Sequence, residues 1–149
     1  MAPTNRVLFA TFACLIALGC SRTKGDEELG RAIVARAQEG GGDVTVADVP
    51  AVTQFSWERV HIFPPNTPAD KVREELGFSW DEAGRIAKQD VVLLVFLDQG
   101  KVVRFVDLPR DAVDLAPTAR KGGYNHSDAV FRCTKQNSGP RRCILANGG

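Results

Sequence analysis

The chain of 149 residues lacks a hydrophobic run long enough to cross a bilayer. Its longest apolar segment lies near the amino terminus and has about 13 residues, whereas a membrane-spanning helix needs roughly 20. Internal repeats are also missing, and the only low-complexity tract is the glycine triplet at positions 40–42. These absences disfavour a retained transmembrane anchor and a repeat architecture, and they favour a single globular domain.

Motifs of the common enzyme classes are missing as well. The sequence has no phosphate-binding glycine loop, no Gly-x-Ser-x-Gly elbow and no zinc signature. Of its two histidines, His61 lies within an apolar strand pattern, which is typical of a packed or edge residue. His126 stands beside Asn125, Ser127 and Asp128, but neighbours in sequence rarely assemble a catalytic triad. We therefore expect no catalytic residue, no cofactor and no metal site.

The amino terminus is built like a secretory signal. Arg6 is the only charged residue before Cys20, and residues 7–18 carry no charge. A positive start, a short apolar core and a small residue before the cleavage point form the secretory pattern. We therefore expect residues 1–19 to be a signal peptide that is removed on export.

The end of this segment, Ala17-Leu18-Gly19-Cys20, resembles the lipobox of bacterial lipoproteins. The resemblance implies that Cys20 receives a diacylglyceryl group and fatty acids such as palmitate, and that it begins the mature chain. Residues 20–25 would then be a tether, and residues 26–149 a single domain. An ordinary signal peptide that leaves Cys20 as a free thiol is the alternative.

Ser21 bears on the location of the mature chain. By resemblance to enterobacterial lipoproteins, a residue other than Asp after the cysteine favours the outer membrane over the inner membrane. We therefore expect a protein of the cell envelope, anchored to the membrane through Cys20 and facing the periplasm.

Export also divides the four cysteines into two groups. Cys14 would leave with the signal peptide and Cys20 would carry lipid, so Cys133 and Cys143 remain. Because the periplasm is oxidising, this pair is expected to form a disulfide. Turn-forming residues at 137–140 separate two strand patterns and would place the pair on a hairpin. A redox pair or a metal site is the alternative, although redox pairs usually have the tighter Cys-x-x-Cys spacing.

Charge is balanced overall but unevenly distributed. The chain has 19 basic and 18 acidic residues, and the part after residue 19 has 18 of each. A neutral chain is not typical of nucleic-acid binders. Residues 117–149, however, contain six basic residues and one acidic residue, Asp128. Either this part complements an acidic part of the same fold, or it forms a basic face toward anionic lipid, lipopolysaccharide or an acidic partner.

Helical patterns predict two helices and a third, shorter one. The first begins at Asp26, where three acidic residues suit the positive end of the helix dipole, and ends before the glycines at 40–42. The second is predicted to be capped by Thr67 and to end at Gly77. The third occupies residues 80–88.

Strand patterns outnumber the helical ones. Residues 91–97 form an unbroken apolar run, which is typical of a central strand covered on both faces. Residues 101–106 return antiparallel to it, with Val103 and Phe105 on one face. The other strand patterns are residues 44–46, 55–63, 113–115, 129–133 and 143–146. The predicted fold class is α+β, with a mainly antiparallel sheet of about five strands and two or three helices on one face.

Residues 55–68, followed by Leu76-Gly77-Phe78, resemble a segment of small uncharacterised exported bacterial proteins. Those proteins are similar in having an aromatic-x-Trp strand that ends in Phe-x-Pro, a capped helix that ends in Leu-Gly, and a later apolar hairpin. The likeness covers about residues 55–106 and implies location and fold, but no catalytic residue. Asn66 stands where that family often has an aromatic residue.

The function predicted from these features is that of a membrane-anchored envelope lipoprotein, a non-catalytic binding or structural module. Its partners would be the membrane, through the lipid on Cys20, and an envelope protein or polymer, but not nucleic acid. Trp57 and Trp80 are expected to be core anchors rather than ligand platforms. The alternative function is a small periplasmic hydrolase in which His126 acts with Ser127 or Asp128.

Overall fold

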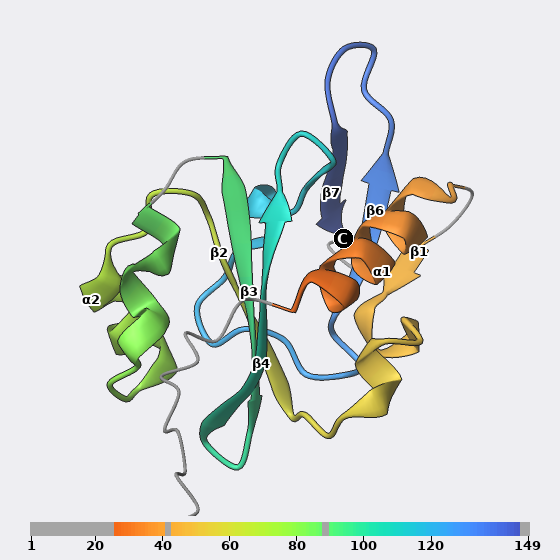
Figure 1. The fold of residues 1–149 in the computed structure, drawn as a ribbon. Helices are drawn as coiled ribbons and strands as arrows, with labels where there is room; N and C mark the ends of the chain where they lie inside the picture. Colours follow the sequence, from red (N-terminus) through yellow and green to blue (C-terminus); the bar gives the residue numbers. More distant parts are fainter. Residues whose placement is uncertain (1–25, 41–42, 88–89, 147–149) are drawn as a thin grey trace, which may run out of the picture.

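The computed structural model describes residues 26–40, 43–87 and 90–146, which form a mixed α and β structure (Figure 1). The α-helices are α1 (Glu27–Gln38) and α2 (Ala69–Leu76), and the short 3₁₀ helices are η1 (Val46–Asp48), η2 (Val52–Gln54), η3 (Asp81–Ala87) and η4 (Ala116–Thr118). The strands are β1 (Asp43–Thr45), β2 (Arg59–Phe63), β3 (Val91–Asp98), β4 (Lys101–Pro109), β5 (Val113–Asp114), β6 (Val130–Thr134) and β7 (Arg141–Leu145). The predicted signal peptide and tether, with Cys20, lie outside the described residues.

The strands form two sheets rather than the single sheet of about five strands that was predicted. One sheet has the order β2-β3-β4 and the other the order β1-β6-β7-β5. Every pairing is antiparallel except β5 with β7, so the fold is mainly antiparallel as expected. In Figure 1 the three-stranded sheet stands in the centre, with β1, β6 and β7 on one side of it and α2 on the other.

The central strand β3 separates two hydrophobic cores. Val92, Leu94 and Phe96 face the main core, which also contains the inward side chains of α1, β1, β6 and β7. Leu93, Val95 and Leu97 face a smaller core formed with α2 and η3. All six side chains are buried, as predicted for a strand covered on both faces. The helices therefore lie on opposite faces of this sheet, and the prediction that they share one face is wrong.

Helix α1 begins and ends as its sequence indicates. Asp26 is the N-cap, and its Oδ1 accepts a hydrogen bond of 3.0 Å from the Leu29 amide. The helix buries Leu29, Ile33 and Ala37 in the main core. Gly30 lies against β4, where an added Cβ would stand 2.8 Å from a methyl of Val106. This close approach explains a glycine inside a helix, which otherwise costs about 1 kcal/mol relative to alanine.

Helix α2 starts one residue later than predicted. Pro68, not Thr67, is the N-cap, and no side chain caps the helix. The Thr67 hydroxyl instead donates a 2.6 Å hydrogen bond to the Pro64 carbonyl, which stabilises the preceding turn. Gly77 ends the helix in the left-handed conformation, φ 80°, as its sequence position indicates. The third helical pattern forms the 3₁₀ helix η3.

The strand faces differ from the prediction where the local pattern is interrupted. Strand β2 begins only at Arg59, and it is buried on both faces, with Val60 and Ile62 in the main core and Phe63 in the smaller one. In β4 the register with β3 shifts opposite Phe96 and Leu97. Val103 is the extra residue of this bulge and packs toward the main core, whereas Phe105 packs toward α2. The prediction that Val103 and Phe105 share a face is therefore wrong.

Tyr124 joins the two sheets. Its backbone makes two hydrogen bonds of 2.8 Å with Val60 of β2, one in each direction. Its ring packs edge-on against Phe131 of β6, with ring centroids 5.2 Å apart. Its hydroxyl donates to the Thr118 carbonyl, and burial raises the pKa of Tyr124. Tyr124 therefore ties the loop after η4 to β2 through its backbone and to β6 through its ring.

Candidate functional site: the chain start, its groove and the disulfide hairpin

The described chain starts at a fixed point on the edge strand β4. The Asp26 amide donates a 2.9 Å hydrogen bond to the Phe105 carbonyl. One carboxylate oxygen of Asp26 caps α1, and the other lies 3.6 Å from Nε of Arg104. Asp26 therefore holds the position at which the preceding segment, whose Cys20 is the predicted lipidation residue, joins the domain.

A groove of about 570 Å³ opens beside Asp26. Its apolar walls are Phe78 and Trp80, from the turn between α2 and η3, and Val102 and Phe105 of β4. The Trp80 ring meets the Phe105 ring edge-on, with centroids 5.2 Å apart. Besides Asp26, the charged lining residues are Lys101 and Arg104, both exposed. The groove thus combines partly exposed aromatic surface with basic side chains.

A second cavity, of about 500 Å³, lies on the other side of the chain start, between α1 and the end of β4. Its lining includes the acidic residues Glu27 and Asp107 and the basic residue Arg31. Asp107 accepts a 2.8 Å hydrogen bond from Nε of Arg85. This cavity has no aromatic side chain in its lining and no excess of basic charge.

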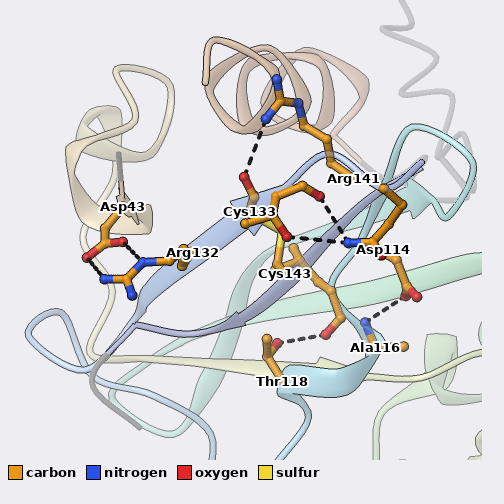
Figure 2. Close-up of a disulfide and its surroundings, with 11 residues drawn as sticks. Asp43, Asp114, Ala116, Thr118, Arg132, Cys133, Arg141 and Cys143 are labelled. Carbon is orange, nitrogen blue, oxygen red and sulfur yellow. Dashed lines mark hydrogen bonds and ion pairs between the residues drawn. A yellow bond between two sulfur atoms is a disulfide. The ribbon is translucent and has the colours of Figure 1, made fainter. Parts of the chain in front are cut away.

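The disulfide predicted between Cys133 and Cys143 is present (Figure 2). The two cysteines are register partners on β6 and β7, and both side chains belong to the main core. Arg141 donates a 3.4 Å hydrogen bond to the Cys133 carbonyl beside the bridge. The disulfide thus fixes the register of the hairpin and also fills part of the core.

The basic residues of segment 117–149 are partly neutralised by acidic side chains, one of them from the rest of the fold. Arg132 of β6 faces Asp43 of β1 and makes two hydrogen bonds of 2.8 and 3.2 Å with its carboxylate (Figure 2). Arg120 pairs with Asp128 at 3.2 Å. The Arg132–Asp43 pair fits the view that the two parts of the chain complement each other, although exposed basic residues remain on the β6–β7 hairpin, such as Arg142.

The residues of the alternative hydrolase lie on an exposed turn. The Ser127 hydroxyl lies 2.8 Å from Oδ1 of Asn125, which also accepts the amides of Ser127 and Asp128. The His126 ring packs against Trp57 at a tilt of 35°, with ring centroids 3.9 Å apart. The side chain of Asn125 therefore organises this turn, and the Ser127 hydroxyl also lies 3.4 Å from Oδ1 of Asp128.

The two tryptophans have different environments. Trp57 is 4% exposed and packs edge-on against Phe96 in the main core, as predicted for a core anchor. Trp80 is only half-buried and forms a wall of the groove beside Asp26. Trp80 packs against the smaller core but also presents surface to solvent.

His61 is the buried polar residue whose surroundings the sequence did not indicate. Its Nδ1 lies 3.7 Å from Oε1 of Glu75 on α2 and has no hydrogen-bond partner among the described residues. The same Glu75 oxygen accepts the Gly122 amide, and Arg59 donates a 2.5 Å hydrogen bond to the Gly122 carbonyl. Gly123, with φ +62°, lies tightly against β2, since an added Cβ would stand 2.5 Å from the Val60 carbonyl oxygen and 3.1 Å from Cγ of His61.

Burial lowers the pKa of His61 below its ordinary value of 6.5. The carboxylate of Glu75 acts in the opposite direction, and Arg59 on the same strand lowers the pKa further. His61 therefore favours the neutral form in the folded protein. Glu75 and Gly122 could not be assigned to this cluster from the sequence, because α2 and the loop meet β2 only in the folded chain.

The sequence and the fold were compared with those of known proteins. No protein-family model matches the chain, and searches of curated proteins and of solved structures gave no significant match.

Within residues 26–40, 43–87 and 90–146, no group of three or more His, Cys, Asp or Glu side chains is arranged to hold a metal ion. None of the helices in the same ranges is both long and apolar enough to span a bilayer.

Removing the disulfide is expected to destabilise the domain. Replacing both Cys133 and Cys143 with alanine should lower the free energy of unfolding by about 3 kcal/mol, because the open chain regains the entropy of a short loop. Urea denaturation measures the loss. Reductant should destabilise the native chain by a similar amount and leave the double variant unchanged. If reductant does not change the urea denaturation of the native sequence, the disulfide is absent and the prediction is wrong.

Burial of His61 predicts that the free energy of unfolding decreases as the pH is lowered. Since its pKa is lower in the folded than in the unfolded chain, the unfolded state binds a proton first as the pH drops through 6.5, and stability is lost there. The His61→Gln variant should show a shallower loss of unfolding free energy between about pH 7.5 and pH 5. The matched variant His126→Gln, at the exposed histidine, should keep the native slope. Equal slopes for both variants would refute this role.

Proposed function

We propose that the chain is a bacterial envelope lipoprotein whose domain acts as a non-catalytic binding or structural module. Residues 1–19 would be the signal peptide, and Cys20 the lipidated first residue of the mature protein. The observation that carries this proposal is the lipobox-like Ala17-Leu18-Gly19-Cys20 directly after a short apolar run.

The arrangement of the domain supports this assignment. Only five residues, 21–25, separate the proposed lipidated cysteine from Asp26, where the described fold begins. The disulfide between Cys133 and Cys143 fits an oxidising compartment such as the periplasm. A lipid on Cys20 would hold the domain at the membrane, because two or more acyl chains anchor a protein stably.

The same proposal includes the location and the lack of catalysis. The protein would face the periplasm, with the outer membrane favoured by Ser21, and its further partner would be an envelope protein or polymer. On the exposed turn of the hydrolase alternative, the Ser127 hydroxyl donates to Oδ1 of Asn125 at 2.8 Å, and the His126 ring packs at a tilt against Trp57.

Mass spectrometry of the full chain, expressed in a bacterial host and extracted from its membranes, tests the anchor. The expected product lacks residues 1–19 and carries a diacylglyceryl group on Cys20. The Cys20→Ser variant should stay unprocessed and unlipidated. Cys14→Ser is the matched control and should be processed as the native chain is. An unmodified Cys20, or cleavage at another position, would overturn the proposal.

A further inference from the structure

The groove beside Asp26 combines the two kinds of side chain that favour a membrane surface. Trp80 presents a half-buried ring, and Phe78 extends the same apolar wall. Tryptophan is enriched at the headgroup level of membranes, because its ring is apolar and its indole N–H is polar. Lys101 brings positive charge, which anionic phospholipid headgroups attract, whereas Arg104 lies 3.6 Å from the Asp26 carboxylate and packs over the Phe55 ring.

The chain start places this groove close to the proposed lipid. Asp26 lines the groove, and its amide is bonded to the Phe105 carbonyl. The six residues from Cys20 to Gly25 span at most about 20 Å when fully extended. The groove therefore cannot move farther than this from the glyceride on Cys20, and its mouth lies beside the point where the tether joins the fold.

The other cavities near the tether fit a bilayer less well. A pocket of about 50 Å³ also has an aromatic and a basic residue, Phe55 and Arg104, but it is much smaller and Arg104 pairs there with Asp26. The second cavity beside the chain start has two acidic residues, Glu27 and Asp107, against one basic residue, Arg31, and no aromatic side chain. The exposed basic residues Lys135 and Arg142 lie on the β6–β7 hairpin, where they accompany no aromatic side chain. Among these surfaces, the groove is the one where an exposed lysine, Lys101, lies beside two partly exposed aromatic side chains.

We propose that the groove formed by Phe78, Trp80 and the start of β4 docks on the phospholipid surface to which the protein is anchored, with Lys101 facing the phosphate groups. This inference rests on the proposed lipidation of Cys20. Because the tether keeps the groove near the lipid, a contact too weak to hold a free protein is sufficient to orient an anchored one. Docking would fix which face of the domain points to the membrane and leave the β6–β7 hairpin and its disulfide for another partner.

Fluorescence of Trp80 in reconstituted vesicles tests the orientation. The lipidated full-length product is reconstituted into vesicles of phosphatidylcholine and phosphatidylglycerol, with or without a phospholipid brominated near the headgroup, which quenches nearby indoles. Flotation of the same sample measures anchoring separately. The native protein should be quenched, and Trp80→Phe, which keeps the buried Trp57, should not. Lys101→Glu should lower the docking equilibrium constant by about fivefold or more. The matched control Lys135→Glu should leave it unchanged.

The outcomes separate the two proposals. Protein that floats with the vesicles but shows no quenching of Trp80 would overturn the docking and leave the anchor standing. Protein that does not float would overturn both. Equal loss of quenching in Lys101→Glu and Lys135→Glu would show a general charge effect and contradict the groove as the docking face. The protection of Trp80 from an aqueous quencher could instead increase with protein concentration at constant lipid. This result would contradict docking on the membrane and assign the groove to a second copy of the chain.

Discussion

Burial of strand β3 on both faces is the constraint on which the other layers depend. Leu94 and Phe96 point into the main core, and Leu93 and Val95 point into the core under α2. Each fully buried side chain of this kind contributes roughly 1.5–3 kcal/mol relative to exposure. Neither core can form without this strand, because it supplies a wall to both. The sheet is thus covered on its two faces by different elements, α1 with the four-stranded sheet and α2 with η3.

Local patterns in the sequence were sufficient for the elements that depend on near neighbours. The apolar run of β3, the acidic start of α1 at Asp26 and the stop at Gly77 act within one turn or one strand, so their structure follows from adjacent residues. The division into two sheets did not follow, because β1 and β5 are short and their partners come from the far end of the chain. The bulge at Val103 likewise depends on the register with β3, which alternation within β4 does not reveal.

The candidate sites show the same limit. The hairpin and its disulfide could be predicted because Cys133 and Cys143 flank a turn. They are also the two cysteines that are left when Cys14 and Cys20 are assigned to the signal peptide and the lipid. The groove could not, since it brings together Asp26, Trp80 and Lys101 from three separate segments. Nor could the contact of His61 with Glu75, which needs α2 to pack across β2. The structure therefore adds contacts between residues that are far apart in the sequence. Around Asp26, these contacts define the face that lies next to the proposed tether.

Native-state hydrogen exchange tests most directly whether β3 organises both cores. As the middle strand of β2-β3-β4, it is hydrogen-bonded on both edges, and its side chains are buried on both faces. Its amides should therefore exchange most slowly and only through global unfolding, while those of α2 and of the β6–β7 hairpin should exchange through smaller openings. If amides of α2 or of the hairpin remain protected after those of β3 have exchanged, the cores do not depend on this strand.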